Sequence, residues 1–142
     1  MKSERDWHEY HSIRRKVLWE LRGLSNYDEN HSDEYNPANH PLLLRLNGRA
    51  IGTVRVDDLG KGRGAVRLVA IEPEFQRQGH GRVLSDLIEK YARGLGMLTL
   101  HVNAAPEAIG YYKKLGWAPE IWDEAELVGI AAECLQMSKR LA

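Results

Sequence analysis

The 142-residue sequence predicts one α/β (α+β) domain of three layers, in which a mixed, mostly antiparallel central sheet carries helices on both faces. Two observations predict this fold class. Apolar runs at residues 42–46 and 51–56 flank Asn47-Gly48, a dipeptide that favours a two-residue turn between antiparallel strands. After this hairpin, extended apolar segments alternate with segments of helical spacing, which is typical of strand–helix–strand units. The length fits a single domain, and we assign residues 1–142 to it.

The chain begins with a predicted helix and a long loop. Residues 6–21 place apolar side chains at helical intervals, with Asp6 as the expected N-cap and Gly23 as the stop. Residues 24–40 are polar and contain few apolar side chains, so they predict a loop. Loops of this length in a compact domain are often functional.

The segments after the hairpin continue the pattern. Residues 57–64 contain three glycines and predict a second hairpin-like loop, which joins the second and third strands. From there the sequence predicts a strand, a helix, a strand, a helix and a strand, at residues 65–71, 81–95, 98–102, 106–116 and 133–138. Glycines at the ends of both helices supply their stop signals.

The composition excludes several classes of protein. Lysine plus arginine equals aspartate plus glutamate at 20 each, and this balance argues against a nucleic-acid-binding module. No apolar run approaches the ~20 residues that span a bilayer, and residues 1–10 lack the apolar core of a signal peptide. With one cysteine, Cys134, the chain cannot form an intrachain disulfide. We therefore expect a cytoplasmic protein without a nucleic-acid or membrane partner.

The turn at residues 76–81, QRQGHG, lies between a predicted strand and a predicted helix. A helix N-terminus presents unpaired N–H groups and a partial positive charge, and so it binds anionic phosphates. Gly79 and Gly81 lack a Cβ that would keep an anion away from the backbone, and Arg77 and Arg82 add positive charge. The turn is thus a candidate pyrophosphate site.

Other interpretations of the two glycines have their own requirements. A dinucleotide-binding fingerprint needs a third glycine where this sequence has Leu84, and a P-loop needs a Gly-Lys-Ser/Thr run that the chain lacks. The glycines could also serve only the entry to the helix. On the turn alone, this last alternative stays open.

The turn also resembles a family signature. Gln76-x-x-Gly79-x-Gly81 is similar to the Q/R-x-x-G-x-G/A signature of the GNAT superfamily of acyl-CoA N-acyltransferases. Residues 68–84, LVAIEPEFQRQGHGRVL, resemble that family's strand, pyrophosphate loop and helix. Residues 108–117, AIGYYKKLGW, resemble its A-x-x-x-Y-x-K-x-G-F/W helix. With the preceding strands, the resemblance spans residues 42–117 and implies a GNAT-like fold.

The resemblance further implies acetyl-CoA (CoA) as the co-substrate and no metal. Backbone N–H groups of the turn would bind the pyrophosphate. Main chain of the preceding strand would pair with the pantetheine arm, beside a gap between two splayed strands that holds the thioester. The implied cofactor-binding residues are Val69, Ala70, Ile71, Gln76, Arg77, Gln78, Gly79, His80, Gly81, Arg82 and Asn103. For Asn103 a second interpretation stays open, in which it caps the helix that follows.

Acetyl transfer to an amine needs the amine in its neutral form. A lysine-type amine has a pKa of ~10.4, so only about one molecule in 10³ is neutral at pH 7, and a base would help. His101 is the candidate base, because it alternates along its strand with the apolar Leu100 and Val102. An ordinary histidine on a polar strand face is the competing interpretation. Other candidate bases are Asp28, Asp33, Glu34 and Glu72.

The reaction also needs an acid and an oxyanion donor. A phenol with a pKa near ~10 can protonate the leaving thiolate, and the resemblance puts Tyr112 at the family's tyrosine position. A core-packing role for Tyr112, with Tyr111 facing the site, stays open. A free backbone N–H near Ala70 or Ile71 is the candidate oxyanion donor.

Together these features predict an N-acetyltransferase. It would transfer an acetyl group from acetyl-CoA to a primary amine of a small molecule or peptide, by direct nucleophilic attack. The alternative is a non-catalytic acyl-CoA-binding module on the same fold. The resemblance also allows a homodimer.

Overall fold

The computed structural model describes residues 3–19, 27–28, 31, 33, 36–76 and 78–141. Its strands are β1 (Asn39–Leu46), β2 (Arg49–Gly60), β3 (Arg63–Ile71), β4 (Thr99–Ala104), β5 (Ala118–Pro119) and β6 (Leu135–Arg140). Its helices are α1 (Glu4–Arg14), α2 (His80–Gly94) and α3 (Ile109–Lys114). Shorter helical turns are η1 (Arg15–Trp19), η4 (Pro73–Phe75), η5 (Pro106–Ala108), η6 (Glu124–Glu126) and η7 (Gly129–Ala131).

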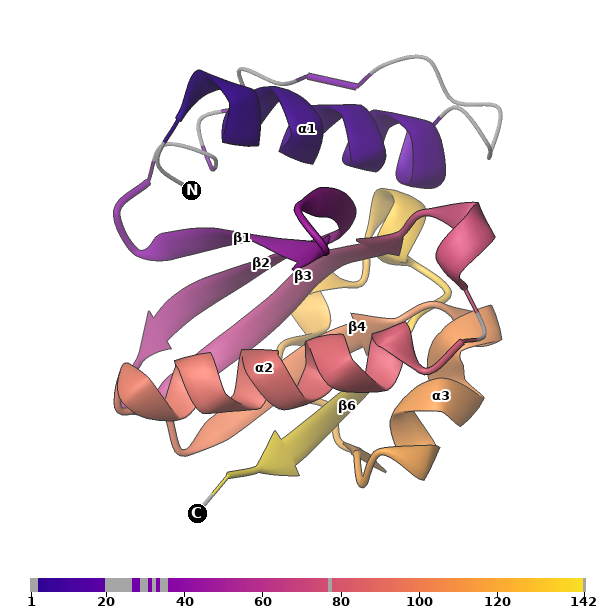
Figure 1. The fold of residues 1–142 in the computed structure, drawn as a ribbon. Helices are drawn as coiled ribbons and strands as arrows, with labels where there is room; N and C mark the ends of the chain where they lie inside the picture. The colour runs from indigo at the N-terminus through magenta and orange to yellow at the C-terminus, as the bar shows by residue number, and fades with distance from the viewer. Residues whose placement is uncertain are drawn as a thin grey trace.

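The strands form one mixed sheet in the order β1-β2-β3-β4-β6-β5, in which β3 and β4 are parallel and the other neighbours are antiparallel. Helix α1 lies on one face of the sheet, and α2 with α3 lies on the other (Figure 1). The predicted fold class is therefore confirmed. The two-residue strand β5 was not predicted, and the last strand begins two residues later than expected, at Leu135.

Both hairpins close with two-residue turns. Asn47 and Gly48 have φ of 51° and 83°, the left-handed pair that a tight turn between twisted strands requires. The second hairpin repeats this geometry at Lys61 and Gly62, with φ of 55° and 75°. The predicted hairpin connection is therefore confirmed, but it is shorter than the predicted loop at residues 57–64. Its polar residues instead pair across the two strands, as in the partnership of Asp57 with Ala65.

The sheet opens between β3 and β4. The two strands pair only from Arg63–Thr99 to Val66–Val102 and separate beyond that point. Just after the last pair, a bulge at Leu68, with φ of 53°, inserts one residue into β3 opposite β2. The extra residue turns Val66 and Val69 to the same face of the sheet, where both line one pocket under α2.

The opposite face of the sheet is covered by α1. Ile13 of this helix packs with Ala50 and Ala70 of the sheet. The N-cap is Ser3, whose hydroxyl accepts from the Asp6 backbone N–H at 3.1 Å, so the prediction of Asp6 as the cap is wrong. The π-helical turn η1 continues the helix over Arg15–Trp19, while its predicted end at Leu21 and its stop at Gly23 lie outside the described residues.

The main core fills the space between the sheet and α2 with α3. Burying each large apolar side chain there contributes about 1.5–3 kcal/mol. Its central members are Val54, Val56, Leu84, Ile88, Leu100, Val102 and Met137. Across the described ranges, no helix combines the length and the apolar character needed to cross a membrane.

Candidate active site

The turn before α2 gives its two glycines different tasks. Gly79 is the N-cap of α2 with φ of 84°, and a Cβ added there would meet no atom within 4 Å. Gly81 instead lies against Tyr111, whose ring carbon Cε1 would be 3.2 Å from an added Cβ. The open side of the turn is therefore at Gly79, while Gly81 makes room for a tyrosine.

Two glutamines bind the main chain around this turn. Gln76 Nε2 donates to the carbonyl of Ile71 at 2.8 Å, and Gln78 Nε2 donates to the carbonyl of Glu74 at 2.7 Å. Both amides thus hold the path of the chain from β3 to α2. They leave the backbone N–H groups of the turn to any bound anion.

The other members of the predicted phosphate site differ in what surrounds them. Arg77 lies outside the described residues. Arg82 is exposed in the first turn of α2, and no hydrogen bond or ion pair engages its side chain within the described part of the chain. The ring of His80 packs edge-on against Phe75, with centroids 5.8 Å apart.

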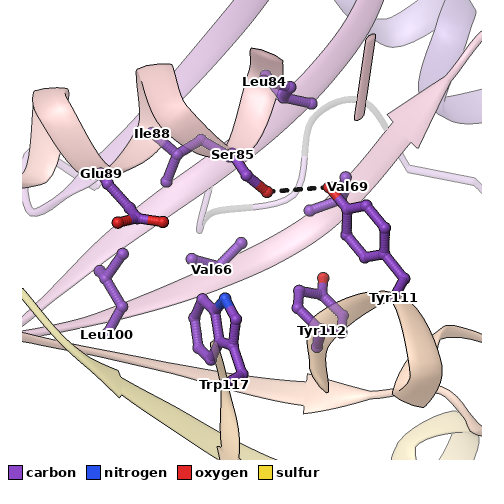
Figure 2. Close-up of a pocket in the computed structure, with 10 residues that line it drawn as sticks. All are labelled: Val66, Val69, Leu84, Ser85, Ile88, Glu89, Leu100, Tyr111, Tyr112 and Trp117. Atoms are coloured by element: carbon purple, nitrogen blue, oxygen red, sulfur yellow. Dashed lines mark hydrogen bonds between the residues drawn. The ribbon is translucent and has the colours of Figure 1, made fainter. Parts of the chain in front are cut away.

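A small pocket lies behind the turn, between α2, α3 and the separating strands. Figure 2 shows its lining side chains, with those of α2 above and those of α3 and the following residues below. Its walls are mainly apolar. The lining residues are Val66, Val69, Leu84, Ser85, Ile88, Glu89, Leu100, Tyr111, Tyr112 and Trp117.

The two tyrosines of α3 are held differently. The Tyr111 hydroxyl donates to the Gly81 carbonyl at 2.7 Å and lies 2.9 Å from Ser85 Oγ, so it ties α3 to the start of α2. Tyr112 is 7% exposed, and its hydroxyl has no hydrogen-bond partner among the described residues. Burial raises the pKa of Tyr112 well above the ordinary phenol value, with a further contribution from Tyr111. Tyr112 therefore keeps its proton at neutral pH.

His101 lies on the other face of the sheet. Its Nε2 accepts from Arg63 Nε at 3.0 Å, so its Nδ1 carries the proton and donates to Ser138 Oγ at 2.6 Å. The imidazole is 3% exposed and stacks on Trp122. Burial lowers its pKa, and the positive charge of Arg63 lowers it further. His101 and Tyr112 are not brought together, because Leu100 takes the face of β4 toward α2.

A carboxylate bridges the two strands on this second face. Glu126 accepts from Arg67 through both oxygens and from Asn103 Nδ2 at 3.0 Å. Arg67 and Asn103 each follow the last paired residue of their strand. Burial raises the pKa of Glu126, but the hydrogen bonds and positive charge of Arg67, together with the hydrogen bond from Asn103, outweigh burial and leave the pKa below the ordinary value. Arg67 also pairs with the buried Asp57 at 3.2 Å.

Asn103 is fully engaged in this arrangement. Its amide oxygen accepts from Gln136 Nε2 at 3.0 Å, in addition to the bond that its nitrogen donates to Glu126. The following helical turn has Ala105 as its N-cap, so the interpretation of Asn103 as a cap is wrong. Its side chain faces away from the pocket under α2.

The other candidate bases are scattered. Glu72, at the end of β3, pairs with Lys16 at 2.8 Å. Asp33 Oδ2 lies 3.8 Å from Arg55 Nη2, and Asp28 also has an interaction partner. Glu34 lies outside the described residues. Of the candidate bases that the structure describes, none lines the pocket beside Tyr112.

Comparison with known proteins agrees with this geometry. The family model described as the Acetyltransferase (GNAT) family matches residues 4–117. The chain belongs to this family. The Bacillus subtilis (strain 168) protein named "Putative acetyltransferase BSU40680" is 29% identical over an alignment of 119 residues, with 81% of this chain and 78% of that protein covered.

Solved GNAT structures share the fold. The ribosomal-protein-S18-alanine N-acetyltransferase from Escherichia coli has a TM-score of 0.74 and 16% identity, over 99% of this chain and 90% of that one. The PaiA N-acetyltransferase from Thermoplasma acidophilum, in complex with coenzyme A, has a TM-score of 0.74 and 15% identity, over 96% of this chain and 93% of that one.

The GNAT fold thus divides the predicted site residues between two faces. The turn, the free edge of β3 and Tyr112 lie toward α2, whereas His101 and Asn103 lie on the face of α1. Sequence reasoning missed Arg67 and Glu126, for which the acidic run at residues 120–126 was the available signal. In the described ranges, no group of three or more His, Cys, Asp or Glu side chains could hold a metal ion.

Proposed function

We propose that this GNAT domain transfers an acetyl group from acetyl-CoA to a primary amine of a small molecule or peptide. The observation that carries this proposal is Tyr112, a buried residue whose hydroxyl has no partner among the described residues. It lies behind the turn at residues 76–81 and beside the separating strands. An acid that keeps its proton at neutral pH suits a reaction whose leaving group is a thiolate.

Acetyl-CoA would bind along the free edge of β3 and at the start of α2. Beyond Val66 this edge has no strand partner in the described part of the sheet, so main chain at residues 69–71 is available to the pantetheine amides. The carbonyl of Ile71 is already held by Gln76, and Ala70 pairs with Thr53 of β2, which favours Val69 and the Ile71 N–H for this pairing. The pyrophosphate would accept from N–H groups near Gly79, each bond contributing about 1.5–3 kcal/mol.

The chemistry then needs no covalent enzyme intermediate. The neutral amine nitrogen attacks the thioester carbon, a C–N bond forms and the C–S bond breaks. A backbone N–H on the free edge near Ala70 or Ile71 would donate to the oxyanion, and Tyr112 would give its proton to the leaving sulfur. The amine loses a proton, and the protein returns to its starting state when Tyr112 regains one.

His101 is not part of this proposed reaction. Both its nitrogens are engaged on the far face, so a structural task fits it better than proton transfer from the amine. We expect His101→Gln to leave the pH profile of kcat unchanged in shape. A shifted acid limb in the kinetic profile would restore His101 as the base.

His101 should instead make stability depend on pH. Its folded pKa lies below the unfolded value of ~6.5, so the unfolded state binds more protons just below that pH. Stability should therefore fall as the pH drops through ~6.5, and less so in His101→Gln. Thermal unfolding of both proteins between pH 5 and 8 measures the difference; equal slopes would contradict the assignment.

The amine would enter from the face that carries Glu126. This face lies opposite the pocket at the point where β3 and β4 separate, and the run at residues 120–126 is acidic. We therefore propose that Glu126 assists binding of acceptors that carry a second positive charge, by sharing its carboxylate between Arg67 and the acceptor.

Glu126→Gln tests this acceptor side. We expect the KM for a diamine to rise about three- to tenfold, because a charge-assisted bond becomes a neutral one, while the KM for acetyl-CoA stays the same. Glu133→Gln, an exposed change outside the run, is the control. An equal rise in KM for a monoamine and a diamine would show that Glu126 acts only through the fold.

A further inference from the structure

The indole of Trp117 carries a buried donor without a partner. Trp117 is 6% exposed, and within the described part of the chain its Nε1–H meets no acceptor. Buried N–H groups are nearly always hydrogen-bonded, and one that is not requires a physical explanation. Trp117 directly follows the Tyr112 helix and packs edge-on against Tyr112, with ring centroids 5.3 Å apart.

The Trp117 Nε1–H group faces the pocket behind the turn at residues 76–81. In Figure 2 the Trp117 nitrogen and the Tyr112 oxygen both point upward into the space below Ser85. The free room in this pocket is about that of one water molecule. A buried water needs two to four polar partners, and Trp117 and Tyr112 supply two.

Ser85 supplies a third partner. The Tyr111 hydroxyl donates its only proton to the Gly81 carbonyl. In the hydrogen bond between Ser85 and Tyr111, Ser85 must therefore be the donor. The lone pairs of Ser85 Oγ are then left to accept. Ser85 lines the same pocket, on the wall opposite Trp117 (Figure 2).

We propose that the pocket holds one ordered water that accepts from Trp117 Nε1–H and donates to Ser85 Oγ and to Tyr112 Oη. Trp117 is thereby a positioning residue for the Tyr112 hydroxyl. This inference rests on the proposed role of Tyr112 as the acid.

The arrangement explains how a deeply buried phenol could serve as an acid. A water that donates to Tyr112 Oη leaves the phenol O–H free for the departing sulfur. When that proton leaves, the same water stabilises the phenolate oxygen through a charge-assisted bond. Burial alone raises the pKa of Tyr112, and a hydrogen bond to its charged form acts in the opposite direction. The water itself gains and loses no proton in this step.

Trp117→Phe removes the N–H and keeps an aromatic ring. We expect kcat to fall about tenfold, less than the ~10²–10⁴-fold that a proton-transfer group itself contributes, with the KM for acetyl-CoA unchanged. In a Tyr112→Phe background, Trp117→Phe should lower kcat no further, because Trp117 affects kcat only through Tyr112. Trp7→Phe on α1 is the matched control. A loss that persists in the Tyr112→Phe background, or an unchanged kcat, would overturn the positioning role.

A crystal structure of the free wild-type protein tests the water itself, without any assay of activity. We expect density for one water within hydrogen-bond distance of Trp117 Nε1 and Tyr112 Oη, and its loss in Trp117→Phe. A pocket without water would refute the proposal even if acetyl transfer is observed. If the water is found but the protein transfers no acetyl group, the proposed function fails while the water site stands, and the positioning role falls with that function.

Discussion

Tyr112→Phe should lower kcat by about 10²–10³-fold and leave the affinity for acetyl-CoA unchanged. The phenylalanine keeps the ring that packs against Trp117, so the core should persist, and only the hydroxyl in the pocket is lost. Steady-state release of CoA thiol measures kcat, and calorimetric titration with acetyl-CoA measures the affinity. Without the phenol, the leaving thiolate would have to depart unprotonated or take its proton from water.

Tyr111→Phe is the control for this experiment. Its hydroxyl ties α3 to α2 through Gly81 and Ser85, so the variant should lose about 1–3 kcal/mol of stability or some CoA affinity. Its kcat should stay much closer to the wild-type value than that of Tyr112→Phe. Full activity in Tyr112→Phe would assign the acid to another group, and a large loss in Tyr111→Phe alone would exchange the roles of the two tyrosines.

Gly79→Val should weaken acetyl-CoA binding by about tenfold or more. Gly79 has φ of 84°, which a β-branched residue avoids, and relaxation of the turn would re-aim the N–H groups at the start of α2. The added side chain would also occupy the open side of the turn, where an anion would approach. Misaligning a single charge-assisted bond costs about 1.5–3 kcal/mol, which already exceeds a factor of ten.

The variant Gly79→Asn separates the effect of backbone strain from the effect of a side chain on the open side of the turn. Asparagine tolerates the left-handed conformation, so this change should preserve the turn and cost less affinity than valine. Calorimetric titration gives both dissociation constants, and thermal unfolding without ligand checks that each variant is folded. An unchanged dissociation constant in Gly79→Val would contradict the proposal that the turn binds pyrophosphate.

Local signals in the sequence predicted much of this fold. Asn47-Gly48 specified the first hairpin, because the left-handed pair it favours is what a two-residue turn needs. Apolar spacing located α2 and α3, and the two GNAT-like motifs located the turn and Tyr112. These features depend on residues that are near one another in the chain.

The remaining features depend on contacts between distant segments. Gly81 appeared to clear a path for an anion, but its partner is Tyr111, thirty positions later. The bulge at Leu68 and the separation of β3 from β4 arise from pairing with other strands, which alternation along one strand does not encode. For the same reason, the sequence did not reveal that Arg63 and Ser138 occupy both nitrogens of His101, and so His101 remained a candidate base.

The most direct test of the central claim is CoA thiol release from acetyl-CoA by the purified wild-type protein, with a panel of primary amines. Thermal unfolding with saturating acetyl-CoA should accompany it, and at 100-fold excess over the dissociation constant binding should add about 2.7 kcal/mol. We predict thiol release that requires both the protein and an amine, with one acetylated amine formed per thiol. Stabilisation by acetyl-CoA with no thiol release for any amine would contradict an acetyltransferase and identify a non-catalytic acyl-CoA-binding domain.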